Sequence, residues 1–192
     1  RPTTFAELES LDGKAATTAD SRDAFQELHE WVAAGEKSPV FCAVLGEYGI
    51  GKTTTLKKFT ENLLDRRVTD PSAPLPIYID LRLRLGQPST VPTLEQLLAD
   101  VIERNHKLAH PSPLTPATII RLVREEGAVI IFDGLDEKIV HLPPAEAQAY
   151  IRELWRVLPP VIRKGELRKG QRLGKMILSC RSHYFRDVLS QN

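Results

Sequence analysis

Short apolar runs alternate with longer amphipathic stretches along this chain. The apolar runs, such as Val-Ile-Ile-Phe at 129–132, predict buried strands at 40–45, 77–81, 128–133 and 175–180. Between and before them, apolar residues recur at helical spacing, which predicts helices at 21–34, 52–66, 93–107, 116–126 and 144–158. Strands that alternate with helices are typical of a parallel sheet covered on both faces, so the pattern predicts an α/β fold.

Local signals set expectations for individual helices. We expect Ser21 to cap the first helix, and Thr93 with Gln96 has the spacing of a capping box. Residues 184–189 are expected to begin a further helix. The buried face of the helix at 52–66 is expected to consist of Leu56, Phe59, Leu63 and Leu64.

A glycine-rich loop joins the first predicted strand to the helix after it. Residues 46–53 read Gly-Glu-Tyr-Gly-Ile-Gly-Lys-Thr and fit G-x-x-x-x-G-K-S/T, the Walker A motif that cradles nucleotide phosphates. Glycines let backbone N–H groups approach the phosphates, and the helix terminus adds a favourable dipole. Lys52 is expected to reach the β- and γ-phosphates, and the Thr53 hydroxyl to bind Mg²⁺. The expected nucleotide contacts are Gly46, Glu47, Tyr48, Gly49, Ile50, Gly51, Lys52, Thr53 and Thr54.

A cluster of acids follows the third predicted strand, where residues 129–137 read Val-Ile-Ile-Phe-Asp-Gly-Leu-Asp-Glu. Ligands of α/β sheets bind at the carboxyl ends of strands, so we expect Asp133 to hold Mg²⁺, through water, as a Walker B acid. One of Asp136 and Glu137 is expected to orient or deprotonate the attacking water, and the longer reach of Glu137 favours it. The alternative for these two acids is a solvated loop or a helix cap.

The fourth predicted strand ends in Ser179-Cys180-Arg181-Ser182-His183. If this strand lies beside the strand before the glycine loop, Arg181 is placed to read the γ-phosphate, because its guanidinium matches phosphate oxygens. The alternative is a surface arginine that starts a turn. We interpret His183 as a hydrogen-bonding loop residue.

The bulk properties narrow the partners and the compartment. The length of 192 residues suits one domain, with a lead-in region at 1–38 and a core at 39–192. A net charge of +1 gives no global field toward nucleic acid or a membrane, so neither is expected as a partner. The basic segment 163–172 lacks aromatic residues and is interpreted as a solvated loop, with a contact to nucleic acid or a neighbouring subunit as the alternative. Cys42 and Cys180 lie in predicted strands, which favours buried free thiols in a reducing cytoplasm.

Three segments make the chain resemble the NACHT family of STAND-class P-loop NTPases, and Arg-Ser-His-Tyr-Phe at 181–185 is similar to bacterial NACHT proteins in particular. The three segments are the loop segment 44–54, the segment Pro-Ile-Tyr-Ile-Asp-Leu-Arg at 76–82, and Asp-Gly-Leu-Asp-Glu at 133–137. The last is the most specific, because this family has a small residue after the metal-binding acid and further acids three and four positions on. Residues 179–182 resemble the sensor-1 segment of the family.

The resemblance implies a three-layer α/β/α sandwich, related to the ASCE and AAA+ branch, with a parallel sheet in the order first, fourth, third, second strand. It implies ATP or ADP with Mg²⁺ as cofactors, and slow hydrolysis that serves a regulatory switch in signalling or antiphage defence. Such proteins form homo-oligomers on activation and use downstream helical and winged-helix domains as partners. The final strand and those domains are expected to lie outside this chain, which we interpret as a piece of a longer protein.

Two other functions remain open from the sequence. One is an AAA+ or kinase-like motor or transferase, although no candidate arginine finger, lid or acceptor pocket stands out. The other is a structural module that holds ADP without turnover. ATP is favoured over GTP because the chain has no Asn/Thr-Lys-x-Asp guanine motif. The base is expected to contact the segment before Ser21.

Overall fold

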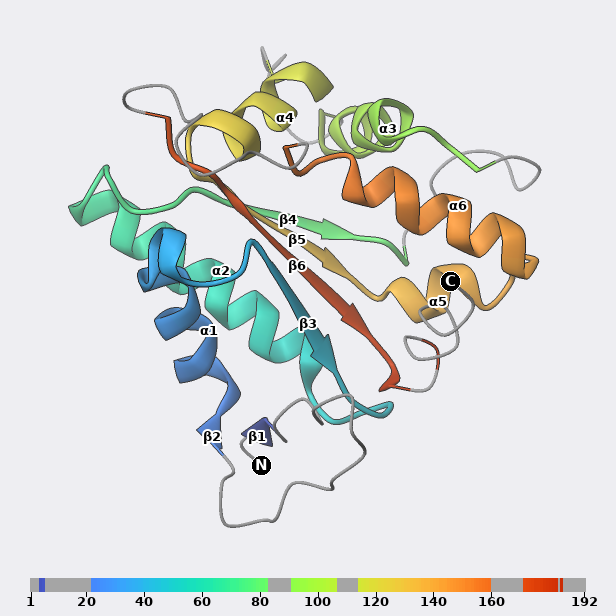
Figure 1. Cartoon of the computed structure of the whole chain (residues 1–192), viewed down its shortest axis with the longest axis horizontal. Coiled ribbons are helices and arrows are strands. Elements are labelled where there is room, and N and C mark those ends of the chain that lie inside the picture. Colours follow the sequence, from blue (N-terminus) through green and yellow to red (C-terminus); the bar gives the residue numbers. More distant parts are fainter. Residues whose placement is uncertain are drawn as a thin grey trace.

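A four-stranded parallel sheet forms the centre of the protein (Figure 1). The computed structural model describes residues 4–5, 22–82, 91–106, 114–159, 171–182 and 184. The strand order is β3-β6-β5-β4, and each neighbouring pair is parallel, which confirms the order expected from the sequence. The strands are β3 (Phe41–Leu45), β4 (Pro76–Asp80), β5 (Val129–Asp133) and β6 (Lys175–Cys180).

Helices cover both faces of this sheet, as Figure 1 shows. On one face α1 (Ala24–Ala33) and α2 (Lys52–Thr69) pack against Val129, Ile131 and Ile177. On the other face α3, α4 and α6 pack against Ile130 and Phe132. These helices are α3 (Leu94–His106), α4 (Pro116–Glu125) and α6 (Pro144–Trp155). A short helix, α5 (Leu135–Ile139), follows β5.

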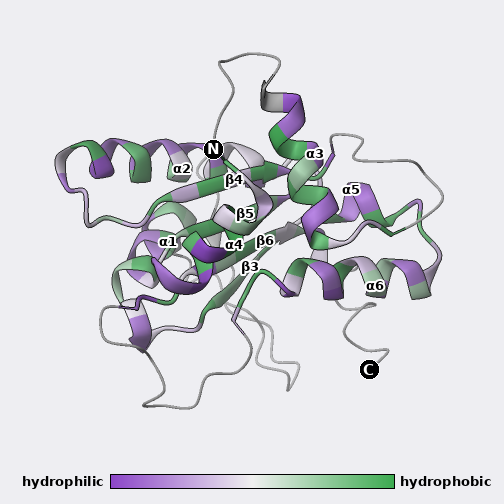
Figure 2. Ribbon diagram, turned by 90° about the horizontal axis from the view of Figure 1, so that it is seen from above, coloured by the Kyte–Doolittle hydropathy of each residue, from purple (hydrophilic) through white to green (hydrophobic). Residues whose placement is uncertain are grey.

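The alternation of side chains along β5 explains the three layers. All five of its residues are buried, and successive side chains point to opposite faces of the sheet. Both faces therefore bury apolar surface, which is what a parallel sheet requires. Hydrophobic residues accordingly concentrate in the central strands, while hydrophilic residues colour much of the surrounding helices (Figure 2).

Some local details differ from the sequence-based predictions. Asp23 caps α1, because its carboxylate accepts from the backbone N of Phe25 at 3.0 Å, and Ser21 lies outside the described residues. Leu64 is 45% exposed and does not belong to the buried face of α2. The capping box of α3 is confirmed by two hydrogen bonds. The backbone N of Thr93 donates to the side-chain oxygen of Gln96 at 2.9 Å, and the backbone N of Gln96 donates to the Thr93 hydroxyl at 3.2 Å.

Four elements were absent from the sequence-based prediction. They are α5, a 3-10 turn η2 (Gly35–Lys37), and a two-stranded antiparallel pair of β1 (Thr4–Phe5) with β2 (Arg22–Asp23). The helix expected at 184–189 lies outside the described residues apart from its first position. Within the described ranges, no helix is long and apolar enough to cross a membrane.

A buried lysine ties the lead-in region to the sheet. Lys175, the first residue of β6, is 5% exposed, and its ammonium donates to the carbonyls of Gly35 and Pro39 at 2.8 and 3.2 Å. It also donates to the Ser38 hydroxyl at 2.5 Å and lies 4.7 Å from the centre of the Trp31 ring. Burial lowers the pKa of Lys175, and the oxygen acceptors offset the cost of burying its charge.

The two cysteines lie on neighbouring strands as free thiols; Cys180 is buried, as the sequence predicted, whereas Cys42 is half-buried. Cys42 is on β3, which is an edge strand of the described sheet, and Cys180 is on β6, which is a central strand. Burial raises the pKa of Cys42 to about 11 and that of Cys180 to about 12.

We predict that neither thiol reacts with iodoacetamide at pH 8 in the folded protein. With a pKa of about 11, only about one Cys42 in a thousand is a thiolate at this pH. Because the folded-state pKa values exceed the unfolded ones, these thiols stabilise the fold below pH 8.5 to 9, and this contribution falls as the pH rises further. Mass spectrometry of labelled protein, with and without urea, measures the reactivity. Rapid labelling of both residues without urea would contradict the raised pKa values of the two thiols.

Candidate nucleotide-binding site

The loop between β3 and α2 has the backbone conformation that its glycines predict. Gly49 and Gly51 have φ values of 77° and 102°, in the left-handed region that other residues rarely adopt. A Cβ atom on Gly46 would lie 3.0 Å from Cγ2 of Ile50. The backbone N of Gly46 donates to the Cys180 carbonyl at 3.3 Å, which anchors the start of the loop to the end of β6.

The Lys52 ammonium lies within this loop. It donates to the backbone carbonyls of Gly46 and Glu47, at 2.7 and 3.1 Å. Gly51 precedes α2 and supplies no side-chain cap, so the motif leaves the first N–H groups of an 18-residue helix to other acceptors. A cation beside an uncapped helix terminus is an arrangement suited to an anionic ligand.

The remaining loop residues turn their side chains outward to different degrees. Tyr48 is 82% and Ile50 46% exposed, and Glu47 and Thr54 are exposed as well. Thr53 is half-buried. The motif assigns the exposed positions to backbone N–H donors, so their exposed side chains agree with it.

The Asp133 carboxylate is buried at the end of β5, with an exposed fraction of 1%. Its Oδ2 accepts from the Tyr78 hydroxyl at 2.6 Å, and its Oδ1 accepts from the Ser179 hydroxyl. Nη2 of Arg82 lies 3.7 Å from Oδ2. Burial and the hydrogen bond to Asp133 both raise the pKa of Tyr78, so this phenol stays neutral and donates its proton.

The glycine after Asp133 has a structural reason. Gly134 has a φ of 81°, and a Cβ atom there would lie 2.8 Å from Cγ of Arg82. Arg82 is held in place by Asp80, with Nε–Oδ1 and Nη2–Oδ2 distances of 2.7 and 2.6 Å. Burial opposes ionisation of Asp80, but the hydrogen bonds from Arg82 keep its pKa below the ordinary value. A small residue at position 134 therefore turns the chain into α5 and makes room for this ion pair.

The acids of α5 have different surroundings. Asp136 is 4% exposed, and its Oδ2 accepts from Nε of Arg181 at 2.6 Å. The Arg181 guanidinium lies 6.0 and 5.5 Å from the ring centres of Tyr48 and Tyr184. Glu137 is exposed. The structure thus brings Arg181 to Asp136 and to the rim of the glycine loop, while its role toward a γ-phosphate stays a prediction.

Sequence reasoning missed four members of the site, which are Tyr78, Asp80, Arg82 and Ser179. These residues contributed to the family resemblance, but no chemical role was expected for them. The available signal was the position of Asp80, which ends β4 as Asp133 ends β5, and the two residues are register partners. The hydroxyl donors could not be identified without knowing which strands flank β5.

Other candidate residues lie elsewhere or outside the described ranges. Within those ranges, no group of three or more His, Cys, Asp or Glu side chains is arranged to hold a metal ion. His183, most of the basic segment 163–172, and most of the segment before Ser21 lie outside them; Arg172 is described and donates to the Ser72 carbonyl at 2.8 Å.

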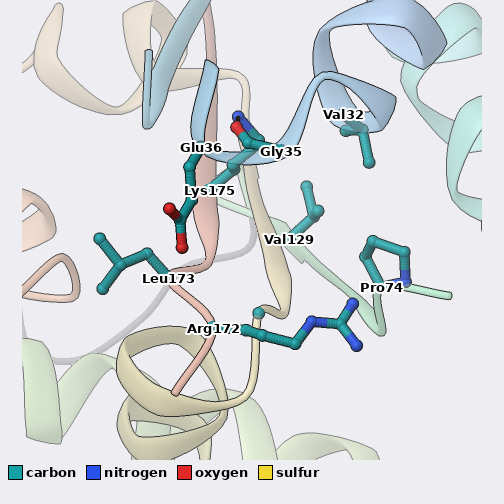
Figure 3. Close-up of a pocket in the computed structure, with 9 residues that line it drawn as sticks. Val32, Gly35, Glu36, Pro74, Val129, Arg172, Leu173 and Lys175 are labelled. Carbon is teal, nitrogen blue, oxygen red and sulfur yellow. Dashed lines mark hydrogen bonds between the residues drawn. The ribbon is translucent and has the colours of Figure 1, made fainter. Parts of the chain in front are cut away.

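A pocket of about 250 Å³ lies away from the glycine loop, at the edge where strands β5 and β6 begin (Figure 3). Its labelled walls include Val129, Leu173 and Lys175. The pocket lies where the strands begin, whereas the candidate site lies at their carboxyl ends, where ligands of parallel sheets bind. The two are therefore separate.

Comparison with known proteins identifies the family. The NACHT domain family model matches residues 41–168, which is two thirds of the 192 residues. This chain belongs to the NACHT family, and it is a P-loop NTPase nucleotide-binding domain. A search of curated proteins found no match.

Two solved structures are similar in fold. The Aeropyrum pernix ORC1 protein in complex with DNA is 19% identical, with a TM-score of 0.52, and the match covers 87% of this chain. The ADP form of the ORC2 protein of the same organism is 15% identical, with a TM-score of 0.45, over 87% of this chain. The chain corresponds to 40% and 43% of the lengths of those two proteins. At this identity, the ORC1 likeness supports the fold alone.

We predict that Gly134→Ala destabilises the protein by more than the cost of a left-handed alanine, which is about 1–2 kcal/mol. The excess comes from the contact with Arg82. Gly35→Ala is the matched control, because Gly35 has a φ of 56° but no atom within 4 Å of the position that its Cβ would take. Urea denaturation of both variants, and of Gly134→Ala in an Arg82→Ala background, measures the contact as a double-mutant cycle. An equal cost of Gly134→Ala with and without Arg82 would contradict it.

Proposed function

We propose that this chain binds ATP and ADP together with Mg²⁺ and hydrolyses ATP slowly as part of a regulatory switch. The observation that carries the proposal is that two features lie together at the carboxyl ends of the parallel strands. The loop holding Lys52 follows β3, the buried Asp133 ends β5, and β6 runs between these two strands. A phosphate cradle and a metal-binding acid are both needed for phosphoryl transfer.

The residues of the site divide the work as follows. The backbone N–H groups of the loop and the Lys52 ammonium bind the phosphates, and Thr53 with Asp133 holds Mg²⁺. When bound, Mg²⁺ neutralises charge on the phosphate oxygens. The donor set fits this ion, because hydroxyl and carboxylate oxygens are ligands that Mg²⁺ prefers. Lys52 exchanges its two carbonyl acceptors for phosphate oxygens, which are the stronger partners for an ammonium.

Glu137 is our candidate for the base that orients the attacking water and accepts its proton. It is exposed, whereas the Asp136 carboxylate is buried and engaged by Arg181. The ion pair with Arg181 occupies an oxygen of the buried Asp136 carboxylate, so Asp136 is better suited to hold Arg181 than to contact a water molecule. We propose that Arg181 leaves this acid to contact the γ-phosphate of ATP.

The wider role rests on family resemblance. We propose that the nucleotide controls homo-oligomerisation through downstream helical and winged-helix domains, in a cytoplasmic signalling or defence pathway. A structural ADP module is the principal rival to this function. A single-turnover assay with γ-labelled ATP separates the two, because the rival releases no phosphate from bound ATP.

Lys52→Ala should lower the affinity for ATP at least tenfold while leaving the fold intact. A charge-assisted hydrogen bond contributes about 1.5–3 kcal/mol, and a tenfold change corresponds to about 1.4 kcal/mol. Calorimetric titration with ATP and Mg²⁺ measures the affinity. Lys58→Ala is the control, since Lys58 is an exposed lysine of the same helix outside the motif. Unchanged affinity in Lys52→Ala would contradict the assignment of the loop as the phosphate-binding loop.

Glu137→Gln should keep ATP binding but slow hydrolysis by about 10²- to 10⁴-fold, which is the usual contribution of a general base. Asp136→Asn should instead increase the preference for ATP over ADP, because it releases Arg181 from its ion pair and so frees the guanidinium for the γ-phosphate. Single-turnover rates and calorimetry on both variants provide the two measurements. If Asp136→Asn abolishes turnover and Glu137→Gln does not, the base is Asp136.

A further inference from the structure

Two hydroxyl groups hold the carboxylate of Asp133 from opposite sides. Tyr78 on β4 donates to Oδ2 at 2.6 Å, and Ser179 on β6 donates to Oδ1. We propose that Tyr78 and Ser179 are positioning residues for Mg²⁺, which fix the orientation in which Asp133 meets the hydration shell of the ion. This inference rests on the proposed function, since it assigns the partners of its metal-binding acid.

The sheet order brings these three side chains together. Tyr78 is the register partner of Ile131, two residues before Asp133, so Tyr78 and Asp133 point to the same face of neighbouring strands. On the other side, Ser179 is one residue beyond the register pair Phe132–Leu178, which places it opposite Asp133. Both donors are therefore supplied by regular strands rather than by loops, and strands hold side chains with little freedom.

The direction of each hydrogen bond is determined by the surrounding groups. The backbone N of Gly134 donates to the Ser179 hydroxyl at 2.8 Å, which leaves the hydroxyl proton for Asp133. The Tyr78 phenol is neutral and has Oδ2 as its acceptor. Each carboxylate oxygen thus accepts one hydrogen bond from a hydroxyl group. A carboxylate has about four lone-pair positions, so both oxygens keep capacity for metal-bound water.

The guanidinium of Arg82 completes the surroundings without replacing the hydroxyls. Its Nη2 atom is 3.7 Å from Asp133 Oδ2, but 2.6 Å from Asp80 Oδ2. Arg82 is therefore primarily the partner of Asp80. The two hydroxyls are the closer donors to Asp133 and are neutral, so they orient the carboxylate without adding a positive charge beside it.

A purely structural role is the rival explanation, because any carboxylate with an exposed fraction of 1% needs hydrogen-bond partners. The two explanations differ in what the loss of a hydroxyl changes. A structural role predicts lower thermal stability with unchanged Mg²⁺ dependence. A positioning role predicts weaker apparent Mg²⁺ affinity, since the loss of such outer partners typically costs about 10- to 100-fold in metal affinity.

The test is calorimetric titration of the 192-residue chain with ATP, first in EDTA and then over a series of Mg²⁺ concentrations. Tyr78→Phe removes one hydroxyl and keeps the ring. We expect it to raise the Mg²⁺ concentration for half-maximal enhancement of ATP binding about 10-fold or more, with the affinity in EDTA changed less than about threefold. Tyr150→Phe is the matched control, because Tyr150 is a fully buried phenol whose hydroxyl has no hydrogen-bond partner among the described residues.

Ser179→Ala repeats the measurement from the other oxygen and carries the test if Tyr78→Phe does not fold. Wild-type Mg²⁺ dependence in the folded variants, with only a lower melting temperature, overturns the inference and leaves the proposed function standing. A wild-type chain that binds no ATP at any Mg²⁺ concentration overturns the proposed function and the inference together. The same Mg²⁺ shift in Tyr150→Phe would also overturn the inference, because the effect would not depend on contact with Asp133.

Discussion

The buried carboxylate of Asp133 is the constraint on which the rest of the candidate site depends. A carboxylate without water is stable only if hydrogen-bond donors surround it. Here the donors come from Tyr78 on one neighbouring strand and Ser179 on the other. The position of β5 between β4 and β6 is therefore required by the chemistry of its last residue, in addition to the burial of its apolar residues. The fold and the candidate site thus both depend on the placement of β5 between β4 and β6.

Ion pairs at the same edge of the sheet keep the site close to electrical balance. Arg82 is bound to Asp80, and Arg181 to Asp136, so each arginine is paired with a carboxylate. Lys52 uses backbone carbonyls, which are weaker partners for an ammonium than phosphate oxygens. A phosphate that enters the site thus competes with backbone carbonyls for Lys52, but with the Asp136 carboxylate for Arg181. We infer that Lys52 binds the phosphate more readily than Arg181 does.

The sequence predicted the architecture well because its strongest signals are local and periodic. The apolar run of β5 and the glycine pattern before Lys52 specify their own conformations, and family resemblance supplied the strand order. The hydroxyl partners of Asp133 escaped prediction because they lie on other strands, 46 and 55 residues away from Asp133 in sequence. Leu64 was placed on the wrong face because helical spacing defines a stripe but not its width, and α5 was too short to produce a periodic signal.

The buried ammonium of Lys175 has a consequence for how the length of the chain can vary. Ser179 lies four residues after Lys175 on the same strand, so both side chains point to one face. A shift of β6 by one residue would move Ser179 to the opposite face and set the ammonium apart from the carbonyls of Gly35 and Pro39. Insertions and deletions between α6 and β6 are therefore compatible with the site only where they are absorbed before Lys175.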